Sequence, residues 1–98
     1  MYLVQTDHYI DLATELCEAI GEEHFYSGHI YLETEDADCK LIISTLVSFS
    51  HVDLPEGEYD QICDITPIWW EFHTTTLDGE QINDFDLETF KRYIRICQ

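Results

Sequence analysis

The spacing of apolar positions predicts a helix near the start of the chain. Apolar residues recur at intervals of three and four up to about Ile20, and Thr6 or Asp7 can cap the first turn. Gly21 follows at the position where helices commonly end. The buried stripe expected from this period consists of Ile10, Ala13, Leu16, Cys17 and Ile20.

A second helix is predicted at the other end of the chain. Asp86 is a candidate N-cap, and Phe85 and Phe90 have the spacing of a hydrophobic staple. Acidic residues gather at the start of this helix and Lys91, Arg92 and Arg95 lie toward its end, which matches the helix dipole. Its expected buried side consists of Leu87, Phe90, Ile94 and Cys97.

Between the two helices the apolar period changes to two, which predicts three strands. Residues 29–34 and 39–50 form the first two, with a turn at 35–38. DLPEGEYD, residues 53–60, is expected to be a solvated loop because it combines Pro, Gly and four acidic residues. Residues 61–75 form the third strand, and a further turn, LDGE, follows it.

Pro67 interrupts the third strand, where it cannot donate a ladder hydrogen bond. A bulge near Pro67 is expected, because the apolar residues before and after it differ in parity. Beyond it, Trp70 is predicted to face the core and Trp69 the opposite side of the sheet.

The element order is therefore α-β-β-β-α in a single domain, residues 1–98. We expect an α+β two-layer sandwich, with a three-stranded antiparallel sheet and both helices on one face. This order resembles that of the double-stranded-RNA-binding domain. The resemblance is one of order only, since the chain lacks the basic residues with which such a domain contacts phosphates.

The other face of the predicted sheet has no cover and is rich in large apolar side chains, which suggests a surface for a second copy or another protein. The alternative is that residues 55–60 or residues 24–28 fold over it. The residues expected on this face are Tyr31, Glu33, Ile42, Leu46, Trp69, Glu71 and His73.

Charge narrows the range of partners. The chain has 21 Asp and Glu against 4 Lys and Arg, a net charge of −17, and Lys40 is the only Lys or Arg before Lys91. Direct binding to nucleic acid or to anionic membranes is therefore not expected.

Five acids on the first helix fall along one side, opposite the apolar stripe, in a ridge about 22 Å long. Such a ridge could mimic nucleic-acid phosphates and block a basic groove, if acids in 33–38, 53–60 and 78–88 supplement it. The composition is similar to that of antirestriction and anti-CRISPR proteins. The alternative is that the acidic face serves only solubility. The ridge consists of Asp7, Asp11, Glu15, Glu18 and Glu22.

No motif indicates catalysis, a cofactor or a dedicated metal site. The acidic segments do not follow the calcium-loop pattern, and the histidines are not closely paired. The N-terminal sequence is unlike a signal peptide, so we expect the cysteines to be buried thiols in the cytoplasm. These cysteines are Cys17, Cys39, Cys63 and Cys97. The expected function is a non-enzymatic protein-interaction module, with a homodimer of unknown role as the alternative and a metal-assisted enzyme third.

Overall fold

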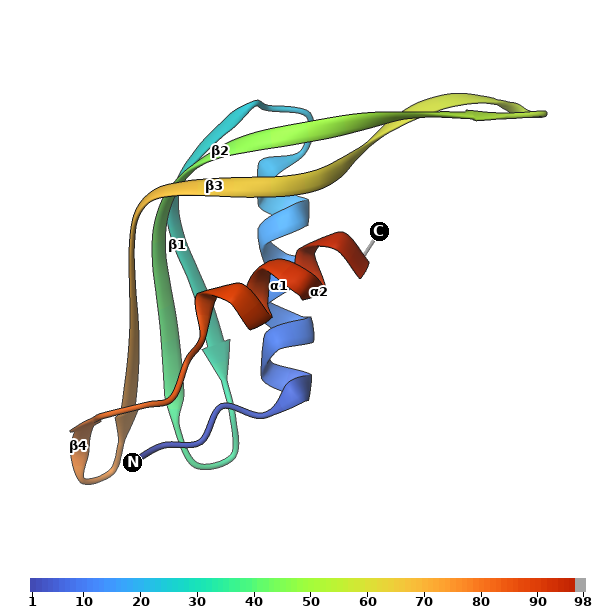
Figure 1. Cartoon of the computed structure of the whole chain (residues 1–98). Helices are drawn as coiled ribbons and strands as arrows, with labels where there is room; N and C mark the ends of the chain where they lie inside the picture. Colours follow the sequence, from blue (N-terminus) through green and yellow to red (C-terminus); the bar gives the residue numbers. More distant parts are fainter. Residues whose placement is uncertain (97–98) are drawn as a thin grey trace.

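The computed structural model of this protein describes residues 1–96 and shows an α+β arrangement of two layers (Figure 1). The strands form one antiparallel sheet in the order β1-β2-β3-β4, and α1 and α2 lie on the same side of it. The molecule measures 52 × 24 × 19 Å. Its elements are α1 (Thr6–Ile20), β1 (Phe25–Glu33), β2 (Asp38–Leu54), β3 (Gly57–Thr76), β4 (Gly79–Gln81) and α2 (Leu87–Ile96).

Helix α1 ends where the sequence predicts, at Gly21, whose φ of 59° is one that glycine adopts readily. Its N-cap is Gln5, one position before the expected cap. The prediction that Ile10 is buried is wrong, since 38% of that residue is exposed. The side of α1 that packs on the core includes Tyr9 and Leu12 instead. The buried residues of α1 are Tyr9, Leu12, Ala13, Leu16 and Ile20.

Helix α2 closes the core from the other end of the chain. Asp86 caps it, because its Oδ2 accepts hydrogen bonds from the Thr89 N–H at 3.1 Å and the Thr89 hydroxyl at 2.6 Å. The staple is confirmed, with the rings of Phe85 and Phe90 5.7 Å apart. Phe90 and Ile94 are fully buried, whereas the predicted burial of Cys97 falls outside the described residues.

Within residues 1–96 the sheet has four strands where the sequence predicts three. The expected LDGE turn shortens to Leu77 and Asp78, and the chain then returns as β4 along Thr74–Thr76 of β3. A strand of three residues has too short an alternation to be recognised by its period. Beside it the N-terminal segment is held in place, since the Tyr2 N–H donates to the Ile82 carbonyl at 2.7 Å.

The segment expected as a solvated loop, residues 53–60, is instead the end of a long hairpin. Strand β1 pairs with β2 as far as Leu46, and beyond it β2 and β3 continue as a two-stranded ribbon. The first part of this ribbon still packs on the core through Val47 and Ile65, and its far part projects from the body as an arm (Figure 1). Pairing continues to Leu54 and Gly57, so the turn is only two residues long. Gly57 has a φ of 148°, which side-chain-bearing residues rarely adopt.

The predicted bulge near Pro67 is confirmed. Ser44 pairs with Trp69 and Thr45 with Pro67, which leaves Ile68 without a partner in β2. A second register shift lies between Ser48 and Phe49. Bulges bend the strand that carries them, and both shifts lie in the part of the sheet from which the arm departs.

Candidate interaction surfaces

The sheet face away from the helices is the main candidate surface, and the register shows which side chains share it. Residues paired across antiparallel strands point to the same side, and alternate residues along a strand do so too. His29, Ile42 and Glu71 form one row across β1, β2 and β3, and Ser44 pairs with Trp69. All seven residues predicted for this face have the parity that places them on it. These are Tyr31, Glu33, Ile42, Leu46, Trp69, Glu71 and His73.

The apolar half of this face is accessible. Trp69 is 49% exposed, Leu46 50% and Tyr31 64%, whereas Ile42 is half-buried. Sequence reasoning missed Phe25, 49% exposed and paired with Leu46, because the predicted first strand began four residues too late. Its signal was the alternation in HFYSG, which continues that of the strand.

The two segments that were expected as possible covers of this face do not cover it. Residues 25–28 belong to β1 and residues 57–60 to β3, so both are part of the sheet itself. Trp70 has the parity of the helix side and contacts Phe85 with ring centroids 5.5 Å apart. Its neighbour Trp69 is therefore directed to the uncovered face, as the sequence predicted.

The other half of the same face is polar. The imidazole of His73 lies between two carboxylates, with Nε2 2.9 Å from Glu71 Oε2 and Nδ1 3.2 Å from Glu80 Oε1. The hydrogen bond to Glu71 is the main cause that raises the pKa of His73 above its ordinary 6.5, and Glu80 adds to this effect. Lys40 and Tyr31 lie beside it in a shallow hollow of about 530 Å³. This half can therefore form hydrogen bonds and ion pairs with a docked partner.

The acidic ridge lies on the outer side of α1, opposite the residues that contact the sheet. Asp7, Asp11, Glu15 and Glu18 are in the helix and exposed, whereas Glu22 follows the end of the helix and is exposed as well. The helical part of the ridge therefore spans roughly 16 Å, shorter than expected. Of the supplementary acids, Glu35 and Asp36 border the same depression as Gln5 and His8 at the start of α1. The arm tip, in contrast, projects away from the body (Figure 1).

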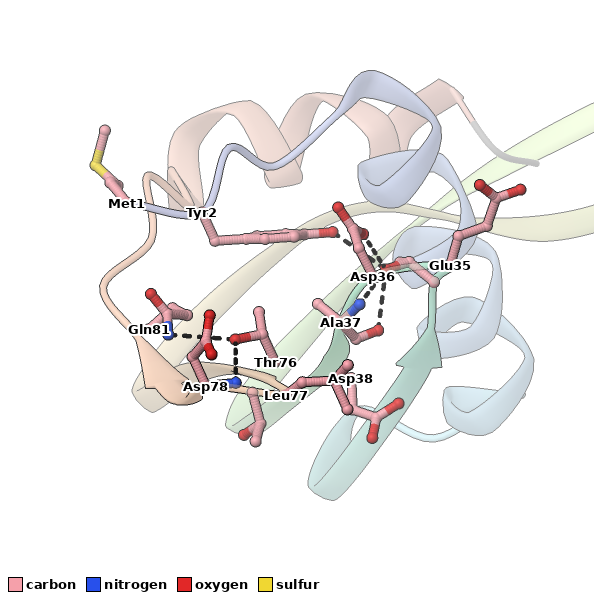
Figure 2. A pocket seen from close by; sticks show the side chains of 12 residues that line it. Met1, Tyr2, Glu35, Asp36, Ala37, Asp38, Thr76, Leu77, Asp78 and Gln81 are labelled. Carbon is pink, nitrogen blue, oxygen red and sulfur yellow. Dashed lines mark hydrogen bonds between the residues drawn. The ribbon is translucent and has the colours of Figure 1, made fainter.

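A depression of about 710 Å³ lies between the N-terminus, the β1–β2 loop and the β3–β4 turn (Figure 2). Thr34 is central to it: its hydroxyl donates to the Ala37 carbonyl at 2.9 Å, and the Ala37 N–H donates back to that oxygen at 3.0 Å. Asp36 Oδ1 lies 3.0 Å from the same hydroxyl. These contacts close the β1–β2 turn, and the acidic rim makes the depression unfavourable for an anionic ligand.

The arm tip gathers a group that sequence reasoning did not identify. His51 Nε2 lies 2.9 Å from Asp53 Oδ1 and 3.0 Å from Glu58 Oε2, and Nδ1 lies 3.0 Å from Asp60 Oδ1. The pKa of His51 is raised, first by the hydrogen bond to Asp60. The sequence did contain a signal for this group, because a histidine and three acids lie at alternate positions on either side of a tight turn. That signal can be recognised only if residues 53–60 are identified as part of a hairpin.

Of the cysteines in the described range, Cys39 is buried and Cys17 and Cys63 are half-buried. Burial raises the pKa of the Cys39 thiol, which disfavours the reactive thiolate. None of the helices in residues 1–96 is long and apolar enough to cross a membrane. Comparison with protein-family models, curated protein sequences and solved structures finds no match to this chain.

Proposed function

We propose that this chain is a non-enzymatic protein-interaction module that binds another protein through the uncovered face of its sheet. The observation that carries the proposal is the exposure of Trp69, Leu46 and Phe25 on the face opposite to the one on which α1 and α2 lie. Burial of one Trp removes roughly 150 to 250 Å² from water, and such side chains are frequent binding hot spots.

Charge favours a foreign partner over a second copy. Each copy carries a net charge of −17, so self-association brings two strongly negative molecules together. The polar half of the face presents Glu33, Asp38 and Glu71 around Lys40. The partner is therefore expected to offer an apolar patch flanked by Lys or Arg.

A pull-down from the native host, combined with size exclusion at several protein concentrations, tests this proposal. Leu46→Asp and Trp69→Ala should abolish capture of a partner that the wild type retains. Leu77→Asp is the matched control, because Leu77 is fully exposed in the β3–β4 turn, away from the face. A wild-type chain that dimerises, and that Leu46→Asp makes monomeric, would favour the homodimer. A monomeric wild type with no capture sensitive to these changes would refute the proposal.

A nucleic-acid mimic is a sharper candidate function, favoured by the exposure of the acidic ridge on α1. The ridge contains only acids and points away from the sheet, so it could enter a basic groove while the sheet face stays available. Successive acids rise about 4.5 to 6 Å along the axis, against about 3.4 Å per phosphate in one DNA strand. The ridge is therefore sparser than the strand it would imitate.

Displacement of a short fluorescent duplex from basic nucleic-acid-binding proteins tests the mimic. The chain should displace the duplex at low salt and lose this ability steeply as salt rises. Asp11→Asn, Glu15→Gln and Glu18→Gln together should reduce displacement. Neutralising Glu35, Glu56 and Asp78, one acid from each supplementary segment, makes the same change in net charge outside the helix and serves as the comparison. Equal effects of both triple variants would assign displacement to net charge alone.

A further inference from the structure

The tip of the β2–β3 arm carries four potential metal-binding or metal-orienting side chains on one face. His51 pairs with Asp60 across the two strands, and Asp53 pairs with Glu58. Paired residues, and alternate residues of one strand, point to the same side. The hairpin register therefore places an imidazole and three carboxylates together, on the side of the arm that continues the helix-covered face of the sheet.

The two nitrogens of the His51 ring have different surroundings. Nδ1 has one neighbour, Asp60 Oδ1 at 3.0 Å, which can accept its proton. Nε2 has two neighbours, Asp53 Oδ1 at 2.9 Å and Glu58 Oε2 at 3.0 Å. A single N–H at Nε2 can donate one straight hydrogen bond, so it cannot serve two carboxylate oxygens equally well. A cation at this point can contact the nitrogen and both oxygens at once.

We propose that the arm tip binds a divalent transition-metal cation of the zinc type. His51 Nε2, Asp53 and Glu58 are its ligands, and Asp60 holds the imidazole by accepting a hydrogen bond from Nδ1. A histidine whose second nitrogen donates to a carboxylate is the usual arrangement behind a metal-bound imidazole. The proposal does not depend on the sheet face, and it departs from the sequence-based expectation of no dedicated metal site.

The distances are close to those that a tetrahedral site requires. Zinc–nitrogen and zinc–oxygen distances of about 2.0 to 2.2 Å separate neighbouring ligand atoms by roughly 3.3 to 3.5 Å. The ligand atoms of His51, Asp53 and Glu58 all lie within 4.8 Å of one another. The two carboxylate oxygens need to withdraw from Nε2 by roughly 0.3 to 0.6 Å, and they need to reach the same separation from each other. All three side chains are exposed, so packing does not oppose this movement.

Charge favours a divalent ion at this position. A protonated His51 neutralises one of its three neighbouring carboxylates, whereas a divalent cation on the neutral ring neutralises two. The imidazole nitrogen selects the type of metal, because magnesium and calcium prefer oxygen ligands and zinc accepts nitrogen readily. Binding would also tie β2 to β3 at the end of an arm in which these two strands pair with each other, and a two-stranded hairpin alone is only marginally stable.

The test is titration of the chelator-treated full chain with zinc, followed by NMR of the histidine rings and by calorimetry. Because cysteine thiolates also bind zinc, the His51 ring signals are the decisive readout. The first equivalent should shift them and slow amide exchange in residues 50–61, whereas equimolar magnesium should not. Signals of His51 that stay unchanged, or that magnesium shifts equally, would overturn the proposal.

Three variants make the test specific. His51→Gln should weaken zinc binding by at least about tenfold, and Asp60→Asn by about 10 to 100-fold, the usual effect of losing an orienting carboxylate. His73→Gln is the matched control, because His73 also contacts two carboxylates, but with one at each nitrogen. It should bind zinc as the wild type does. Equal zinc affinity of His51→Gln and His73→Gln would refute the site.

Discussion

The hydroxyl of Tyr9 accepts a hydrogen bond of 2.9 Å from the backbone N–H of Asp86, the residue that caps α2. The two residues are 77 positions apart, so this bond joins the first helix to the start of the last. Around it the Tyr9 ring stacks on Phe85 and Tyr93, with centroids 5.5 and 6.0 Å apart. The junction of the two helices is thus a polar contact inside an aromatic cluster.

Tyr9→Phe keeps the ring but removes the acceptor for the Asp86 N–H. We expect the free energy of unfolding to fall by about 0.5 to 1.5 kcal/mol, the usual net contribution of one hydrogen bond, because this bond is partly buried. Urea denaturation measures the change. Tyr59→Phe, on the exposed arm, is the control and should stay within about 0.5 kcal/mol of the wild type. Equal small effects would mean that water replaces the Tyr9 hydroxyl.

Asp86→Ala should lower the unfolding temperature, because the carboxylate that binds Thr89 at the start of α2 is lost. Asp86→Asn should retain most of the stability, since Asn caps helices equally well. Thermal denaturation followed by circular dichroism compares the two. Full stability of Asp86→Ala would show that the Phe85 and Phe90 staple holds this helix end without the cap.

The same residue predicts a dependence on acid. Hydrogen bonds from the side chain and then the backbone of Thr89 lower the pKa of Asp86 below its ordinary 3.8. Its stabilising effect is therefore complete above 3.8 and is lost as the pH falls through the lowered pKa. Asp86→Asn should lose less stability over this acid range than the wild type. If both proteins lost the same amount of stability as the pH falls, this linkage would be contradicted.

His73 predicts the opposite dependence. Because Glu71 and Glu80 raise its pKa, its stabilising effect is complete below 6.5 and is lost as the pH rises through the raised value. His73→Gln should therefore be less stable than the wild type at about pH 6 and nearly equal to it at about pH 9. The free energy of unfolding at both pH values measures this. A difference that is independent of pH would mean that His73 acts by packing alone.

Added salt should raise the unfolding temperature of the wild type. With a net charge of −17, repulsion between like charges opposes the compact state, and ions screen it. Ion pairs act in the other direction, since Asp64 Oδ1 lies 3.2 Å from Arg95 and 3.9 Å from Lys91. Thermal denaturation over a series of salt concentrations tests this. Stability that falls as salt is added would show that such ion pairs outweigh the repulsion between like charges.

Local pattern was enough for the features that depend on neighbours in sequence. The end of α1 at Gly21, the cap at Asp86 and the bulge near Pro67 follow from backbone preferences that act over a few residues. The opposite directions of Trp69 and Trp70 follow from strand alternation. The extent of burial could not be predicted in this way. Trp70 points to the helix side, but it is still 36% exposed.

Two helices, the alternating faces of the main strands and a strongly negative surface could all be predicted without coordinates, because periodicity and charge are properties of the chain alone. Tertiary pairing decided the rest. Residues 53–60 have the composition of a loop, yet they extend an arm because β2 and β3 remain paired as far as Leu54 and Gly57. That register, set by contacts between distant strands, also brings His51 within reach of Glu58 and Asp60, which no local preference could fix.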